Sequence, residues 1–88
     1  MFYVYLLYSN KDKKLYTGST NNLVERVKRH NKGLVKSTKN RRPLKLIYYE
    51  ACNNRKDSMR REIYLKSSWG KRYLKNRLKE YMKKIKNS

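Results

Sequence analysis

The stretch that decides the fold is residues 3–30, YVYLLYSNKDKKLYTGSTNNLVERVKRH. Residues 2–8, FYVYLLY, are aromatic, aliphatic and β-branched without a breaker, which predicts a strand buried on both faces. The polar residues 9–14 form a connection of hairpin length, and residues 15–17, LYT, predict the returning strand. Gly18 follows where a Cβ would hinder a turn or a close backbone approach. The chain is therefore expected to begin with a β-hairpin.

A helix is expected directly after the hairpin, because the capping residues 20–22, TNN, precede an amphipathic segment. Gly33 is expected to follow the end of this helix. Its apolar face is predicted to consist of Leu23, Val24 and Val27. On a helical wheel, His30 falls at the edge of that face and Arg26 just beyond it. Both side chains should lie along the border between core and solvent, where a cleft can form.

The rest of the chain predicts one more strand and two more helices. Residues 34–43, LVKSTKNRRP, carry four basic residues and no acid, so a partner-binding loop and a solvated linker both stay open. Residues 44–51, LKLIYYEA, predict a third strand. A helix is predicted over about 55–69, ended by Gly70, and a third over 71–85 with one apolar stripe and a largely basic opposite face.

These elements predict an α+β fold in the order β-β-α-β-α-α. The sheet should be small, three-stranded and antiparallel, with helices flanking it. Eighty-eight residues are enough for one small domain, so residues 1–88 are expected to form a single unit. Its core should span about residues 2–70, followed by the basic C-terminal helix.

Glu62 has the environment that most needs an explanation. The predicted helix places it on the side that carries Met59, Ile63 and Trp69, away from the solvated side. An unpaired carboxylate in such a place would be strongly destabilising, so a cation should accompany it. A bound metal ion could be that cation, and so could Lys66 one helical turn later.

The composition favours a polyanionic partner. Lys and Arg number 25 against 6 Asp and Glu, which gives a net charge of +19, although generic basicity stays open as an explanation. The single cysteine, Cys52, excludes an internal disulfide and fits a reducing cytoplasm. The apolar start, Met1–Leu7, is too short to span a membrane. The expected protein is cytoplasmic, binds nucleic acid and has no membrane partner.

Several motifs occur together and in order. Tyr3-Val4-Tyr5 is followed by Tyr16-Thr17-Gly18, with Tyr5 and Tyr16 eleven residues apart. Further along stand Arg26, His30, Arg41-Arg42-Pro43, Tyr48-Tyr49-Glu50 and Arg60-Arg61-Glu62. In this combination the chain resembles the GIY-YIG nuclease superfamily, and within it the small free-standing bacterial branch. The first glycine of the GIY motif is Tyr3 here, which is usual for that branch.

The resemblance implies the GIY-YIG fold and a DNA endonuclease that hydrolyses phosphodiesters, with a role in DNA repair or processing. It assigns Tyr16 as the general base, with Tyr5 and His30 positioning the water or the base. Arg26 would contact the phosphate through its guanidinium. Glu62 would hold one Mg²⁺ or Mn²⁺ ion as a hard oxygen ligand. Each of these residues also has an ordinary structural reading, as a strand aromatic, an edge histidine, a surface cation or a salt-bridge partner.

The expected partner is DNA, either duplex or branched, with single strands also possible. The cations expected to contact it lie in the first helix and the basic loop: Lys28, Arg29, Lys36, Lys39, Arg41 and Arg42. One alternative is a nucleic-acid-binding module with the same fold and little or no turnover. A second is a basic RNA-associated protein without an active site. The retention of all five site residues argues against both alternatives.

Overall fold

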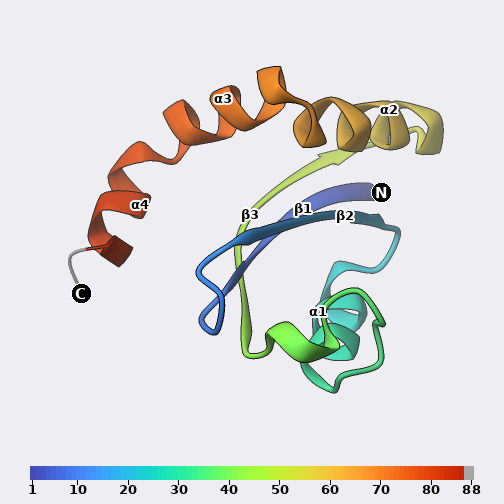
Figure 1. Ribbon diagram of the computed structural model, residues 1–88. Coiled ribbons are helices and arrows are strands. Elements are labelled where there is room, and N and C mark those ends of the chain that lie inside the picture. The colour runs from blue at the N-terminus through green and yellow to red at the C-terminus, as the bar shows by residue number, and fades with distance from the viewer. Residues whose placement is uncertain (87–88) are drawn as a thin grey trace.

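The computed structural model describes the backbone of residues 1–86 (Figure 1). The elements follow the order β1 (Phe2–Ser9), β2 (Leu15–Thr20), α1 (Leu23–Asn31), the 3₁₀ helix η1 (Lys39–Arg41), β3 (Leu44–Cys52), α2 (Arg55–Lys66), α3 (Ser68–Arg77) and α4 (Lys79–Lys86). The three strands form one antiparallel sheet in the order β2-β1-β3. This confirms the predicted α+β class and the predicted three-stranded antiparallel sheet.

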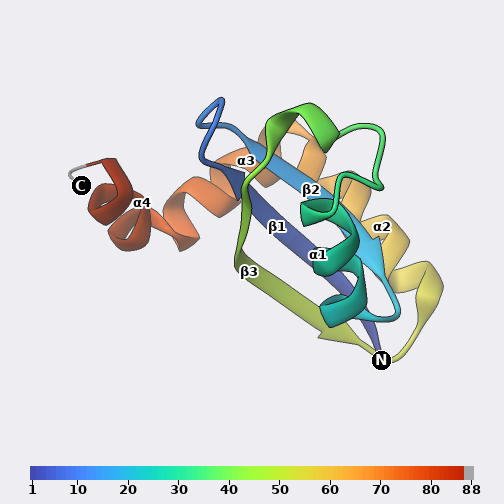
Figure 2. The same cartoon turned by 90° about the horizontal axis from the view of Figure 1, so that it is seen from below.

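The sheet has helices on both faces, with α1 on one face and α2 and α3 on the other (Figures 1 and 2). Because successive side chains of a strand point to opposite faces, β1 supplies both layers of the core. Tyr5 and Leu7 are buried on the α1 side. Val4 and Leu6 are buried on the other side, against Leu65 of α2 and against α3. The central strand is buried on both faces, as its sequence predicts.

The register of the hairpin explains Gly18. In the β1–β2 pair, Tyr5 lies opposite Gly18 and Leu7 lies opposite Tyr16. A Cβ atom on Gly18 would overlap the phenol oxygen of Tyr5. The glycine therefore makes room for the Tyr5 side chain to pass over its neighbouring strand.

Helix α1 begins where the sequence predicts, but its apolar face differs from the predicted one. The Asn22 side chain caps it by accepting a hydrogen bond of 3.2 Å from the Glu25 backbone N–H. Leu23 and Val27 pack against the buried cluster on this side of the sheet. Val24 is 67% exposed, so its predicted place on the apolar face is wrong.

The second helix ends at Lys66, not at the predicted Gly70. Ser67 has extended backbone dihedrals, and its Oγ donates a 2.6 Å hydrogen bond to the Tyr64 carbonyl. The same oxygen accepts a 3.2 Å bond from the Gly70 N–H, which caps α3. Gly70 lies inside α3, where a Cβ would overlap the Tyr64 carbonyl oxygen and the Leu65 backbone. A serine cap divides the predicted helix, and the glycine permits close packing after it.

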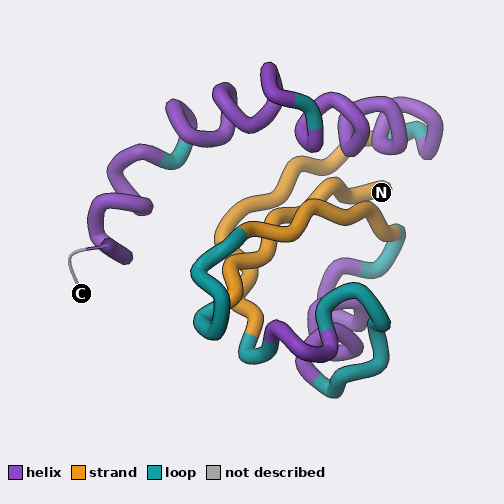
Figure 3. The backbone as a smooth tube through the Cα atoms, in the orientation of Figure 1, coloured by secondary structure: helices purple, strands orange, loops and turns teal. Residues whose placement is uncertain are grey.

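A second break, at Leu78, divides the predicted third helix into α3 and α4 (Figure 3). The apolar stripe predicted along this segment is nevertheless turned toward protein. Leu74 is buried, and Leu78, Tyr81 and Ile85 are half-buried. No helix within residues 1–86 combines the length and the apolar character needed to cross a membrane.

Two of the quoted motifs form a structural cluster between β3 and α2. Arg61 donates to both carboxylate oxygens of Glu50, at 2.8 and 2.9 Å, and Tyr48 donates a further bond to Glu50 at 2.9 Å. The Arg61 guanidinium also lies over the rings of Tyr64 and Tyr73. The hydrogen bond from Arg61 lowers the pKa of Glu50. The acid of the YYE motif and the second arginine of the RRE motif therefore tie the sheet to its helices.

Candidate active site

Three predicted site residues, Tyr5, Arg26 and His30, meet one unpredicted residue, Thr38, between β1, α1 and the basic loop. The Tyr5 hydroxyl lies 2.7 Å from His30 Nε2, and Arg26 Nε donates to the same hydroxyl at 3.4 Å. On its other side His30 Nδ1 lies 2.7 Å from Thr38 Oγ1. Tyr5 is 1% exposed, and His30 and Thr38 are 0% exposed. A strand, a helix and the basic loop thus contribute to one buried chain of hydrogen bonds.

The electrostatics of this chain favour neutral side chains at its centre. Burial and, to a smaller extent, the nearby Arg26 charge together lower the pKa of His30 to about 4. Burial also raises the pKa of Tyr5, against the opposing effect of the Arg26 hydrogen bond. At neutral pH Tyr5 is therefore a phenol and His30 a neutral imidazole, with one donor and one acceptor nitrogen.

We assign the direction of these bonds from the contact between Arg26 and Tyr5. Since Tyr5 accepts from Arg26, its own proton is free to be donated to His30 Nε2. His30 then carries its proton on Nδ1 and donates it to Thr38. The chain runs from Arg26 through Tyr5 and His30 to Thr38, and it fixes the orientation of the Tyr5 hydroxyl.

Tyr16 completes the aromatic part of the cluster. Its ring centroid lies 6.4 Å from that of Tyr5 and 5.1 Å from that of His30. Tyr16 is half-buried on β2, which is an edge strand of the sheet. Tyr16 is therefore packed against the buried pair while it retains access to solvent.

Glu62 lies close by, in surroundings that differ from those predicted. Met59, Ile63 and Trp69 are 46%, 71% and 67% exposed, so the expected apolar surroundings are wrong. The helix turns Ser58 and Leu65 toward the sheet instead. The Glu62 side chain is 21% exposed and pairs with Lys66 at 2.9 Å. Ser19 Oγ donates to its other oxygen at 2.9 Å. The salt bridge with Lys66, which the sequence offered as the alternative to a bound metal ion, is thus present.

A cleft of about 490 Å³ places Arg26 and Glu62 in one cavity. Arg26 comes from α1 and Glu62 from α2, so the cleft bridges the two faces of the sheet around the end of β2. The lining residues are Phe2, Ser19, Thr20, Asn21, Arg26, Arg55, Ser58, Met59 and Glu62. Three arginine or carboxylate groups in a concave polar site are suited to a phosphate and a cation.

The donor set fits a metal ion that keeps most of its water ligands. Glu62 offers a partly exposed carboxylate at the cleft, and each of its oxygens has one protein partner and a remaining lone pair. The part of the chain that the structure describes contains no group of three or more His, Cys, Asp or Glu side chains arranged for a metal. Mg²⁺ is commonly bound through one or two carboxylates, with waters and substrate phosphates as the other ligands. Lys66 is the local competitor for such an ion.

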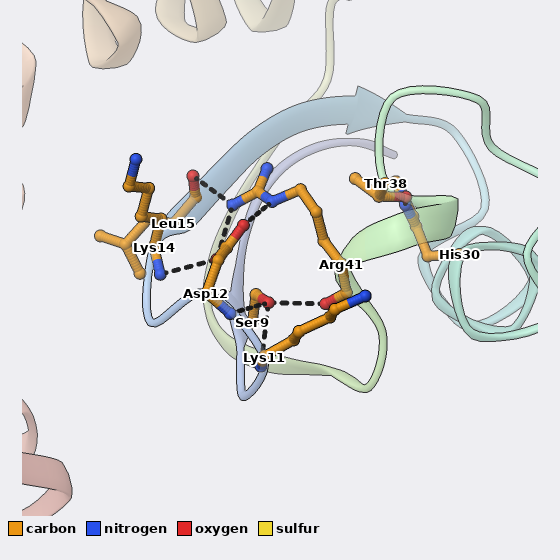
Figure 4. A network of polar contacts seen from close by, with 8 residues as sticks. All are labelled: Ser9, Lys11, Asp12, Lys14, Leu15, His30, Thr38 and Arg41. Carbon is orange, nitrogen blue, oxygen red and sulfur yellow. Dashed lines mark hydrogen bonds and ion pairs between the residues drawn. The ribbon is translucent and has the colours of Figure 1, made fainter.

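The six predicted nucleic-acid contacts fall into two groups. Lys28, Arg29, Lys36, Lys39 and Arg42 are exposed. Arg41 is tied into the structure, where its Nε donates to Asp12 at 2.6 Å and its Nη2 donates to the Leu15 carbonyl at 3.3 Å (Figure 4). Ser9 Oγ donates to the Arg41 carbonyl and accepts from two backbone N–H groups of the hairpin loop. Arg41 therefore joins the hairpin to η1.

Thr38 and Ser19 are site residues that sequence reasoning missed. Thr38 stands within a basic, polar loop, where a buried hydroxyl leaves no periodic signal. Ser19 follows Gly18 directly, and strand alternation places it on the face opposite Tyr16, toward α2. A predicted strand that continued beyond residues 15–17 would have placed Ser19 on this face from the sequence alone.

Comparison with known proteins identifies relatives of this chain. Residues 1–74 match the GIY-YIG catalytic domain. A UPF0213 protein of Clostridium perfringens is 49% identical over 67 residues, covering 75% of this chain and 71% of the relative. A UPF0213 protein of Pediococcus acidilactici is 46% identical over 81 residues, covering 85% and 82% of the two chains. No solved structure gives a significant match. The chain therefore belongs to the GIY-YIG family of nuclease domains.

Proposed function

We propose that this protein is a divalent-metal-dependent DNA endonuclease with Tyr5, Tyr16, Arg26, His30 and Glu62 as its site. The observation that carries the proposal is the buried Arg26–Tyr5–His30 chain, with Tyr16 against it and Glu62 in the cleft that Arg26 lines. An ordinary aromatic core does not require a neutral histidine fixed between two hydroxyl groups. The high positive charge supports a nucleic-acid substrate.

In the proposed mechanism, Arg26 binds the scissile phosphate and balances the charge that develops on its oxygens. Tyr16, as the general base, accepts the proton of the attacking water. Tyr5 and His30 hold the reacting groups in place, because their own hydrogen bonds are fixed by burial. The metal ion held by Glu62 would supply positive charge at the phosphoryl and leaving oxygens.

The proposal includes the wider setting predicted from the sequence. Lys28, Arg29, Lys36, Lys39 and Arg42 would contact phosphates beyond the site, while Arg41 would act through its ion pair with Asp12. Cys52 is a free thiol, which agrees with a reducing cytoplasm as the place of action. DNA repair or processing is the role that we propose.

The experiment is cleavage of supercoiled, branched and single-stranded DNA with Mg²⁺, with Mn²⁺ or with EDTA. Cleavage should require the metal. Arg26→Lys should reduce the rate about 10²–10³-fold, as expected when a preorganised charge is displaced. Arg60→Lys is the matched control, since Arg60 is exposed and pairs with Asp57 of its own helix. Cleavage that persists in EDTA, or equal rates for both variants, would contradict the proposal.

A nucleic-acid-binding module without turnover is the second candidate. The Lys66–Glu62 ion pair favours it, because Lys66 occupies a carboxylate oxygen that a metal ion would need. This candidate predicts tight DNA binding that is independent of divalent metal, and no cleavage of any of the three substrates.

A further inference from the structure

A second concave surface, which we call the β2 groove, lies beside the cleft and is not part of the predicted DNA-contact surface. Its volume is about 690 Å³. Its residues come from β1, the hairpin loop, β2 and α2 to α4: Leu6, Lys13, Lys14, Leu15, Tyr16, Thr17, Leu65, Lys66, Lys71, Leu74 and Met82. The loop of residues 34–43 follows α1 on the other face of the sheet (Figure 1).

The chemistry of the β2 groove is that of a phosphate-bearing strand. Four exposed lysines, from three separate parts of the chain, line it, and its lining includes no Asp or Glu: Lys13, Lys14, Lys66 and Lys71. Buried leucines form its floor, namely Leu6, Leu65 and Leu74. Lysines at a rim can bind phosphates, and an apolar floor can contact sugars and bases. A flat basic face would bind the phosphates but would offer no apolar surface for the sugars and bases.

The β2 groove and the cleft follow the same seam between β2 and α2. Along β2, Ser19 and Thr20 line the cleft, whereas Tyr16 and Thr17 line the groove. Along α2 the same order holds, since Glu62 lines the cleft and Lys66 lines the groove. The two surfaces therefore adjoin at the Glu62–Lys66 ion pair.

We propose that the β2 groove binds the sugar–phosphate backbone of one nucleic-acid strand on one side of the cleaved phosphate. A strand whose phosphate lies in the cleft, at Arg26 and Glu62, has a continuous path along the seam into the groove. The lysines bind its phosphates there, and the apolar floor contacts the sugar or base between them. This inference rests on the proposed function and adds the path of the substrate to it.

The test compares two double variants that remove the same charge. Lys14→Gln/Lys71→Gln removes two groove lysines from separate elements. The control, Lys56→Gln/Lys84→Gln, removes two exposed lysines that line neither cavity. Binding of short fluorescein-labelled single-stranded and duplex DNA is measured by anisotropy across a range of salt concentrations, in EDTA so that nothing is cleaved.

The groove variant should make the negative slope of log K against log salt shallower by about 1.4 to 1.8. Each lost phosphate contact reduces the magnitude of this slope by roughly 0.7 to 0.9. The control should lower it by less than half as much. If both variants lost the same amount of salt dependence, the lysines would act only through a general positive field, and the proposed role of the β2 groove would be overturned. The proposed function would still stand in that case, provided that the wild-type protein cleaves DNA. Wild-type protein that binds neither DNA would overturn both.

Discussion

The Tyr5 hydroxyl lies 2.7 Å from His30 Nε2, and both side chains are almost completely buried. This bond joins the central strand to α1 directly beneath Arg26. Protonation of His30 would disrupt this bond in the folded protein, because a proton on Nε2 would have to replace the one that Tyr5 donates. Acid should therefore weaken the fold through this residue.

We expect stability to fall between pH 6.5 and about 4. Burial and the nearby Arg26 charge lower the pKa of His30 from 6.5 to about 4, so the unfolded chain binds the additional proton in this interval. The contribution is present above pH 6.5 and is lost as the pH falls, to a total of about 3 kcal/mol. His30 is the only histidine of the chain, so its imidazole NMR signal can be followed directly. A titration midpoint near 6.5 in the folded protein would refute this prediction.

Thr38→Val should destabilise the protein by about 1–3 kcal/mol, because the buried His30 Nδ1 loses its hydrogen-bond partner. It should also shift His30 toward the other tautomer, with the proton on Nε2. Thr38→Ser keeps the hydroxyl and is the matched control. Chemical denaturation measures the stability, and ¹⁵N shifts of the single imidazole report the tautomer. If both variants had the same tautomer as the wild type, Thr38 would not position His30.

Lys66→Met should strengthen binding of Mn²⁺ about two- to fivefold in the absence of DNA, because it removes the cation that occupies a Glu62 oxygen. Lys71→Met removes the same charge from a lysine that is exposed in the β2 groove, and it should have the smaller effect. Glu62→Gln should abolish this binding. Electron paramagnetic resonance of free Mn²⁺ measures all three. Unchanged binding in Glu62→Gln would remove Glu62 as the metal ligand.

The sequence was sufficient for the strands and for the start of α1. Unbroken aromatic and aliphatic residues mark β1, and Asn22 caps α1 as a side chain of its type should. The contacts among Tyr5, Arg26 and His30 could also be predicted, since strand alternation and helical spacing place these residues on facing surfaces.

The surroundings of Glu62 could not be predicted from the sequence. The apolar residues of α2 do not mark a single face, because Ile63 is exposed while Ser58 is buried against the sheet. Small polar side chains can occupy such a face when two elements approach closely. The break at Ser67 then moved Trp69 to another helix, so that a continuous helical wheel no longer applied.

The most direct test of the proposed active site is single-turnover cleavage by Tyr16→Phe across pH, with saturating metal. Phenylalanine keeps the ring that packs against His30 and removes the group that takes the proton. The account predicts a loss of about 10²–10⁴-fold with DNA affinity and thermal stability nearly unchanged. Tyr8→Phe, outside the cluster on β1, should cleave at nearly the wild-type rate. Cleavage by Tyr16→Phe at the wild-type rate and with the wild-type pH dependence would contradict the account.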